Sequence, residues 1–258
     1  MIEPFVGIRN FRELLKRGGR PLGISASFSD PLITEALADS VDFFWYDLEH
    51  SKLDPSALSA HMLAARGRAK AAMVRVASAD PAVVKPVLDA GADGIILAQV
   101  TSVDEVRRLV DGCLYPPDGH RGVGPRVPTN YDRADFSYFA EANRNIFTAV
   151  MLETADALAA IEEIVRVPRL DSVVIGPTDL SFSLGVAGQK QGPEVTAAMD
   201  RVVATAHAAG VSVGSGMEAD PAFATWLFEH GVDWIQYGCD FHHLIRSIDS
   251  GIAEIRHA

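Results

Sequence analysis

Short apolar segments that alternate with helical patterns constrain the fold of this chain more than any other feature. Each apolar segment is rich in β-branched or aromatic residues, the types that are enriched in strands. Their near-continuous apolar character is typical of a parallel sheet that is buried on both faces. The predicted strands span residues 21–28, 41–49, 70–76, 94–100, 145–153, 171–177, 211–217 and 232–240.

The segments between these strands carry the start and stop signals of helices. Asp80-Pro81 and Asp220-Pro221 each combine an N-cap residue with proline at the first helical position. Gly91 and Gly210 are placed to close two of the helices. The predicted helices span residues 31–40, 54–68, 81–91, 103–112, 155–167, 194–209, 220–230 and 241–256.

The alternation of strands and helices predicts an α/β fold, a closed (β/α)₈ TIM barrel. We expect one domain over residues 1–258, because the length is close to the roughly 250 residues of such a barrel and no linker divides the chain. The alternative is a doubly wound open sheet. That fold usually has fewer strands, and no G-x-G-x-x-G follows the first strand.

The acidic balance of the chain argues against two classes of partner. The net charge is −11 and the pI is about 5.1, so nucleic acid and anionic membrane surfaces would be repelled. No apolar run approaches the ~18 residues of a membrane span, and the first residues do not resemble a signal peptide. Cys113 and Cys239 are too few for a disulfide framework, which predicts a reducing, cytoplasmic location.

A Gly- and Pro-rich segment at residues 113–135 is predicted to be a long loop. Long structured loops in compact domains are usually functional or interfacial. Because this loop follows the fourth strand, we expect it at the C-terminal face of the barrel, where active sites lie.

Polar side chains gather where the predicted strands end. In a barrel of parallel strands these ends meet at one rim, and polar residues there indicate catalysis more than stability. The residues are Asp47, Glu49, His50, Arg75, Glu153 and Asp179.

Glu153 and Asp179 are the best candidates for metal ligands. Two carboxylates, completed by water and substrate oxygens, suit Mg²⁺ or Mn²⁺, with Co²⁺ as a possible substitute. The alternative is two unrelated carboxylates, with Asp179 capping the helix that it opens after Gly176-Pro177-Thr178.

Three further side chains have a catalytic and a structural interpretation. His50 is the best general base because histidine titrates near neutral pH, although a lone histidine is more often structural. Arg75 would bind an anionic substrate or enolate, or else pair with Asp47 or Glu49. Asp89 would orient His50, or else be a solvated helix carboxylate.

Six sequence motifs, taken together and in this order, resemble the HpcH/HpaI aldolase family over nearly the whole chain. These are class II pyruvate aldolases that cleave 4-hydroxy-2-oxo acids and 2-keto-3-deoxy sugar acids. The motifs are Y-D-L-E-H-S at 46–51, M-V-R-V at 73–76, V-L-D-A-G-A-D-G-I-I-L at 87–97, Y-P-P-D-G-H-R-G-V-G at 115–124, M-L-E-T at 151–154 and V-V-I-G-P-T-D-L-S at 173–181.

The resemblance implies a (β/α)₈ barrel assembled as a hexamer of swapped dimers, and it implies roles for single residues. Glu153 and Asp179 would be the metal ligands. His50 would be the catalytic base, paired with Asp89. Arg75 would bind the pyruvate oxygen and stabilise the enolate.

The resemblance also places the substrate. The backbone around Pro177 and Thr178 would meet the pyruvate carboxylate at a helix N-terminus. Met151 stands where the family often has glutamine, which removes a polar contact near the ketone. The segment Y-G-C-D-F-H-H-L at 237–244 adds two histidines to the family pattern. Both departures bear on the substrate more than on the class of reaction.

The expected activity is that of an aldehyde-lyase. It would reversibly cleave a 4-hydroxy-2-oxo acid or a 2-keto-3-deoxy sugar acid to pyruvate and an aldehyde, through a metal-stabilised enolate. One alternative is an acyl-CoA lyase of the citramalyl- or malyl-CoA type, which the short acidic chain disfavours. The other is a barrel that binds a 2-oxo acid without turning it over, towards which only Met151 points.

Overall fold

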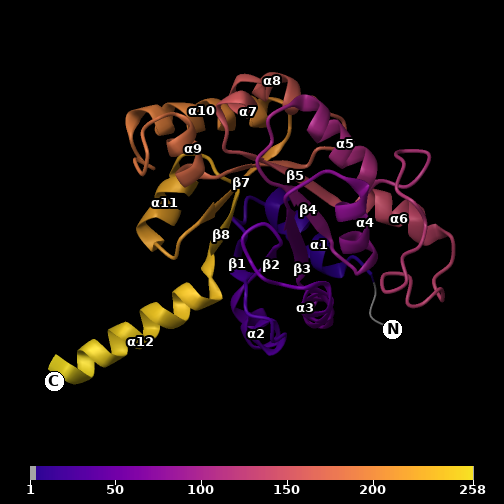
Figure 1. Ribbon diagram of the computed structural model, residues 1–258, viewed down its shortest axis with the longest axis horizontal. Coiled ribbons are helices and arrows are strands. Elements are labelled where there is room, and N and C mark those ends of the chain that lie inside the picture. Colours follow the sequence, from indigo (N-terminus) through magenta and orange to yellow (C-terminus); the bar gives the residue numbers. More distant parts are fainter. Residues whose placement is uncertain (1–3, 258) are drawn as a thin grey trace.

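Eight parallel strands close into a barrel in the computed structural model, which describes residues 4–257 (Figure 1). Each strand pairs with the next along the chain, and the last pairs with the first. The predicted (β/α)₈ fold is confirmed. The strands are β1 Leu22–Ala26, β2 Phe43–Asp47, β3 Ala71–Val76, β4 Gly94–Leu97, β5 Phe147–Leu152, β6 Ser172–Ile175, β7 Ser212–Met217 and β8 Trp234–Cys239.

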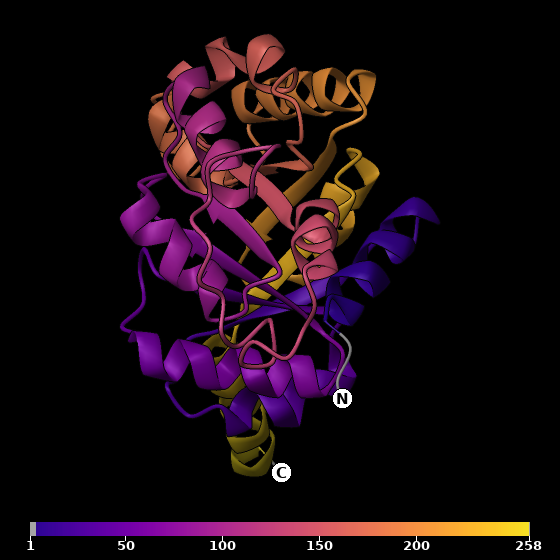
Figure 2. The same ribbon diagram turned by 90° about the vertical axis from the view of Figure 1, so that its right-hand side faces the viewer.

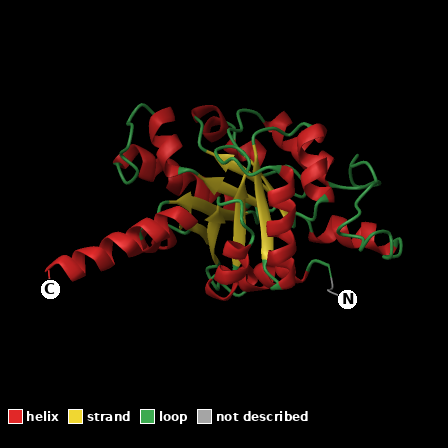
Figure 3. Cartoon of the chain, turned by 60° about the horizontal axis from the view of Figure 1, so that its bottom comes forward, coloured by secondary structure: helices red, strands yellow, loops and turns green. Residues whose placement is uncertain are grey.

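Helices surround the strands on all sides (Figure 3). The predicted caps are confirmed, since Asp80 and Asp220 accept hydrogen bonds from the first backbone N–H groups of their helices, and Gly91 and Gly210 have positive φ. The predicted helix at 155–167 is split in two. The helices expected from the sequence are α2 Leu32–Leu37 with a 3₁₀ turn at Ala38–Ser40, α3 Pro55–Gly67, α4 Pro81–Asp89, α5 Val103–Cys113, α7 Ala155–Ala159, α8 Ile161–Ile164, α10 Pro193–Ala208, α11 Pro221–Glu229 and α12 Asp240–His257.

Helix α1, Val6–Lys16, was not predicted, and it closes one end of the barrel. The ring of its buried Phe11 makes edge-to-face contacts with Phe43, Phe147 and Trp234. These three residues lie at the starts of β2, β5 and β8. The N-terminal end of the barrel is therefore filled with aromatic rings, and only the opposite end is open to a site.

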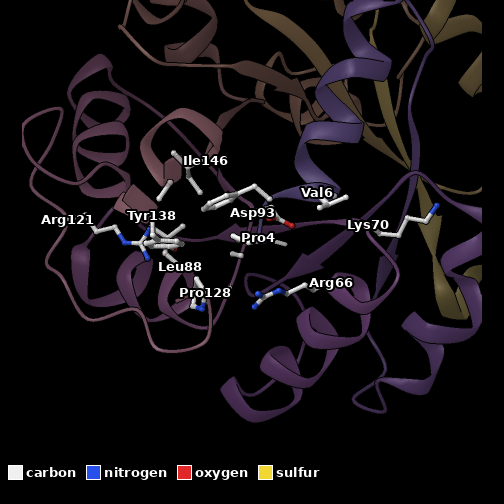
Figure 4. A pocket seen from close by; sticks show the side chains of 15 residues that line it. Pro4, Val6, Arg66, Lys70, Leu88, Asp93, Arg121, Pro128, Tyr138 and Ile146 are labelled. Carbon is white, nitrogen blue, oxygen red and sulfur yellow. The ribbon is translucent and has the colours of Figure 1, made fainter. Parts of the chain in front are cut away.

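The long loop does not lie where the sequence analysis placed it. Helix α5 carries the chain back to the N-terminal ends of the strands before the loop begins, so the expected position at the C-terminal face is wrong. The loop's Arg121 and Pro128 line a small cavity of about 40 Å³ together with Lys70 and Asp93, which precede β3 and β4 (Figure 4). The loop ends in a helix that was not predicted, α6 Ser137–Asn145.

Helix α12 leaves the barrel and projects into solvent (Figures 1 and 2). Its length agrees with the predicted helix at 241–256. Many of its apolar side chains are exposed, namely Phe241, Leu244, Ile245, Ile248, Ile252 and Ile255. None of the helices within residues 4–257 combines the length and the apolar character needed to cross a membrane.

Candidate active site at the open end of the barrel

A cavity of about 210 Å³ opens at the C-terminal ends of the strands. The structure brings six of the predicted rim and site residues to its wall, namely Asp47, Arg75, Met151, Pro177, Thr178 and Asp179. They come from β2, from β3, from β5 and from the first turn of α9, Pro177–Ser183, a helix whose extent was not predicted. Their convergence follows from the parallel barrel, because strand ends that are far apart in sequence share one rim.

Arg75 is held rigidly by two carboxylates. Its Nε and Nη2 donate to the two oxygens of Asp47 at 2.9 and 2.6 Å, and its Nη1 lies 3.1 Å from Oε2 of Glu49. The same Nη1 lies 3.7 Å from the sulfur of Met151. Burial opposes the charged form of Asp47, but the hydrogen bonds from Arg75 outweigh it and hold the pKa of Asp47 below its ordinary value. The bidentate pairing fixes the plane of the guanidinium at the cavity wall.

Glu153 is buried beside Gly176, which lines the cavity, and one of its carboxylate oxygens is unsatisfied. Oε1 accepts a hydrogen bond of 2.8 Å from the backbone N–H of Gln99, whereas the buried Oε2 has no partner within residues 4–257. Burial, followed by the charges of Asp179 and Glu49, raises the pKa of Glu153 to about 7. A Cβ at Gly176 would be 2.6 Å from Oε2, so only glycine leaves room for this carboxylate.

The arrangement around Glu153 fits a cation. A buried carboxylate oxygen without a partner is costly unless a positive charge compensates it. Asp179 caps no helix end, since α9 begins at the N-cap Gly176 without a side-chain hydrogen bond. The described residues contain no group of three or more His, Cys, Asp and Glu arranged around one point. A divalent ion here would therefore rely on two carboxylates, completed by water and substrate oxygens.

His50 and Asp89 are not brought together within the chain. The side chain of His50 is exposed, with Nε2 3.5 Å from Oε2 of Glu49. Asp89 ends α4, and its Oδ1 lies 2.8 Å from Nη2 of Arg121. Helix α4 runs from the end of β3 back to the start of β4, so the two residues lie at opposite ends of the barrel. The expected His50–Asp89 pair is therefore not formed within one chain.

Comparison with known proteins decides the family. The model of the HpcH/HpaI aldolase/citrate lyase family matches residues 25–247. This chain belongs to that family. The resemblance that the motifs suggested is confirmed, and the protein is an enzyme of a lyase family.

Relatives of known activity and a solved structure cover nearly the full length of this family member. It is 33% identical to a hydroxypyruvate/pyruvate aldolase of Roseovarius nubinhibens, over 95% of this chain and 96% of that protein. It is 31% identical to a 2-keto-3-deoxy-L-rhamnonate aldolase of Salmonella gallinarum, over 94% and 91%. The crystal structure of an HpcH/HpaI aldolase from Desulfitobacterium hafniense superposes with a TM-score of 0.90 at 29% identity, over 96% of each chain.

Gln99 and Trp45 are two contributors to the site among those that the sequence analysis missed. Gln99 has a left-handed backbone, with φ of 51°, and this conformation accompanies the hydrogen bond from its N–H to Glu153. No sequence signal marks such a residue, because glutamine rarely adopts this conformation. Trp45 lines the cavity from β2. The alternation of side chains along that strand, which places Phe43 inside the barrel, could have identified it.

The raised pKa of Glu153 predicts a pH-dependent stability of the metal-free protein. Because the folded carboxyl binds its proton more tightly than the unfolded one, its contribution is complete below the unfolded pKa and is lost as the pH rises through about 7. Glu153→Gln keeps a neutral side chain, so in chelator its free energy of unfolding should gain on that of wild type between about pH 5 and pH 8, by on the order of 2 kcal/mol. The gain should be measured as a growing difference in melting temperature.

Comparing wild type with Glu153→Gln cancels the titration of every group that the two proteins share. Asp93 also has a pKa raised to about 7 by burial, and it is present in both, so its effect cancels in the difference. A difference in melting temperature that stays constant over this pH range would contradict the prediction.

Proposed function

We propose that this protein is a divalent-metal-dependent class II pyruvate aldolase. It reversibly cleaves a 4-hydroxy-2-oxo acid or a 2-keto-3-deoxy sugar acid to pyruvate and an aldehyde. The observation that carries the proposal is the unpaired buried oxygen of Glu153, next to Gly176 and within the field of Asp179 and Arg75, three residues that line one cavity. The aldolase activities in the names of its relatives support it.

Glu153 and Asp179 would hold the metal, Mg²⁺ or Mn²⁺ with Co²⁺ as a substitute. Oxygen ligands suit these hard cations, and the two carboxylates provide the negative charge that such an ion requires. A divalent ion bound there supplies Lewis acidity to the ketone of the substrate.

Arg75 acts where negative charge develops. In cleavage the 4-hydroxyl loses its proton, the C3–C4 bond breaks, and its electron pair moves toward the C2 oxygen as the aldehyde forms. Asp47 and Glu49 fix the guanidinium before the substrate arrives, so little reorganisation is needed. Protonation of C3 then completes pyruvate.

His50 is the proposed base for the 4-hydroxyl proton. It stands at the exposed rim, where an aldehyde-forming end of the substrate would lie, and Glu49 neighbours its ring. Asp89 can support His50 only from a second copy of the chain, because the two lie at opposite ends of one barrel.

The remaining predicted residues would bind the 2-oxo acid. Pro177 and Thr178 present the first backbone turn of α9 to the cavity, a position suited to the pyruvate carboxylate. Met151 lies between Arg75 and Gly176 and gives this part of the cavity an apolar floor. The two free cysteines suit a reducing compartment, and we place the enzyme in the cytoplasm on that ground.

Pyruvate release from a panel of 4-hydroxy-2-oxo acids tests the proposal. We expect activity that EDTA abolishes and Mg²⁺ or Mn²⁺ restores. Glu153→Ala should lose the metal and nearly all turnover, whereas Glu163→Ala, which removes an exposed carboxylate from α8, should not. Full activity in the chelated enzyme would refute the metal requirement. Turnover of malyl- or citramalyl-CoA alone would favour the thioester alternative, and pyruvate binding without any turnover would favour the binding barrel.

Arg75 provides a separate test, because a catalytic and a structural role predict different losses. An interaction that strengthens as the C2 oxygen gains charge lowers the barrier, and removing one such donor typically costs about 10²–10³ in turnover. Arg75→Ala should show that loss in kcat, and Arg75→Lys should recover part of it. Near-normal kcat with a depressed melting temperature, measured on both variants, would assign Arg75 a structural role only.

The exposed apolar face of α12 supports a homo-oligomer, and the resemblance implies a hexamer. Side chains such as Ile245, Ile248 and Ile252 would be buried against a second copy of the chain. Light scattering should give a multiple of 27.7 kDa. Ile248→Glu with Ile252→Glu should reduce that mass, whereas Ser250→Glu, on the opposite face of the helix, should leave it unchanged. A monomeric wild type would rule out this use of α12.

A further inference from the structure

A second and larger cavity, of about 430 Å³, lies outside the barrel between α4 and α5. These two helices are side by side in Figure 1. The turns that follow β3 and β4 close the cavity at one end, and loop residues 120–122 close it at the other. None of its lining residues belongs to the cavity of the candidate active site.

Three cationic side chains face this cleft without full compensation. Lys85 of α4 and Arg108 of α5 make no hydrogen bond or ion pair with any residue in the described part of the chain. Arg121 is buried, and although its Nη2 binds Asp89, its Nε has no partner. Nζ of Lys85 would lie 2.9 Å from a Cβ at Gly122, so this side chain reaches across to the loop beside Arg121.

The acidic side chains of the cleft keep their charge but form no ion pair with Lys85 or Arg108, because each is held by other donors. Asp80 caps α4 by accepting from the N–H of Ala82. Glu105 accepts from the N–H groups of Thr101 and Ser102 at the start of α5. Asp111 lies 2.7 Å from Nδ1 of His120. The cleft therefore holds two cations and one buried guanidinium N–H that remain to be paired.

We propose that the cleft between α4 and α5 binds a small dianion, a phosphate ester or a dicarboxylate. Two unpaired cations match two negative charges, and the guanidinium N–H groups of Arg108 and Arg121 suit oxygen acceptors of either class. The volume is that of a site for a small metabolite rather than for a single ion. The ligand would lie against Lys85 and Arg108, with Arg121 at the end formed by loop residues 120–122.

Gln99 connects the cleft directly to Glu153, the candidate metal ligand. Gln99 lines the cleft, and its backbone N–H donates to Oε1 of Glu153. A ligand that contacts Gln99 would therefore change the hydrogen bond that orients this carboxylate. Regulation of turnover by the dianion follows from this link and rests on the proposed function, whereas binding of the dianion does not.

Isothermal titration of the intact protein tests the binding, with glycerol 3-phosphate and succinate as the two probes and glycerol as the neutral control. At least one dianion should bind with one site per chain. Lys85→Met and Arg108→Met should each weaken it about tenfold or more, the loss expected for a charge-assisted hydrogen bond. Arg107→Met is the matched control, because Arg107 precedes Arg108 on α5 but pairs with Asp104 outside the cleft.

A further variant separates this site from the candidate active site. Arg75→Ala should retain binding of the dianion if the cleft holds it. Loss of binding in Arg75→Ala but not in Lys85→Met and Arg108→Met would overturn the proposal, as would the absence of saturable binding or an equal loss in Arg107→Met. Melting temperatures identify any variant that is misfolded. The decisive comparison is dianion binding in the double variant Lys85→Met/Arg108→Met, which should be lost, against binding in Arg75→Ala, which should be retained.

Turnover measured with and without the bound dianion tests the link through Gln99. A saturating dianion should change kcat or KM of the wild type by severalfold and leave the double variant unaffected. Binding without any effect on turnover would refute the link through Gln99 but not the proposed binding site. A protein that binds the dianion but cleaves no 2-oxo acid would refute the proposed function instead.

Discussion

The packing of aromatic rings at one end of the barrel is the constraint on which the rest of the structure depends. Phe11 of α1 meets Phe43, Phe147 and Trp234 edge to face, and such pairs add to the free energy gained by burying their large apolar surfaces. Gly214 permits this, because a Cβ there would be 2.2 Å from the indole of Trp234. With this end filled, buried polar side chains can reach open space only at the opposite rim.

The charges at that rim support the proposed cation. Arg75 is bound to both oxygens of Asp47, which compensates one negative charge with one positive charge. The carboxylates of Glu49, Glu153 and Asp179 then remain in excess over the single guanidinium, in surroundings where Glu153 is almost fully buried. Raising the pKa of Glu153 is one response to this excess, and binding a divalent ion is the other. A 2-oxo acid, whose carboxylate is itself anionic, would become a suitable ligand only after the excess is compensated.

Local signals in the sequence predicted much of the fold, and the errors arose where distant contacts decide the outcome. The strands and most helices followed from apolar patterns, and caps such as Asp80 and Asp220 depend only on their neighbours. Helix α1 escaped prediction because its role as the plug of the barrel depends on Phe43 and Trp234, which lie far away in sequence. The long loop lies near the N-terminal ends of the strands, and not at the C-terminal face, because α5 returns the chain before the loop begins.

In the candidate site, too, local signals were sufficient for some residues and distant contacts decided the others. Arg75 and Asp179 could be assigned to the rim from strand ends alone, since parallel strands share one direction. The pairing of His50 with Asp89 could not be judged in this way, because a motif gives the presence of two residues and not the end of the barrel at which each lies. Gln99 was missed because its contribution is a backbone N–H in an unusual conformation, to which the identity of the side chain gives no clue.

The backbone conformation of Gln99 is coupled to the ionisation of Glu153. A left-handed backbone at a residue other than glycine costs about 1–3 kcal/mol, and a hydrogen bond to a charged group returns about 1.5–3 kcal/mol. The conformation of Gln99 is thus stabilised best when Glu153 is ionised, which is also the form that binds a cation. Ionisation of Glu153 and the shape of the turn at Gln99 consequently favour each other. Because that turn forms part of the wall of the cleft between α4 and α5, the charge of Glu153 and the geometry of the cleft would be thermodynamically linked.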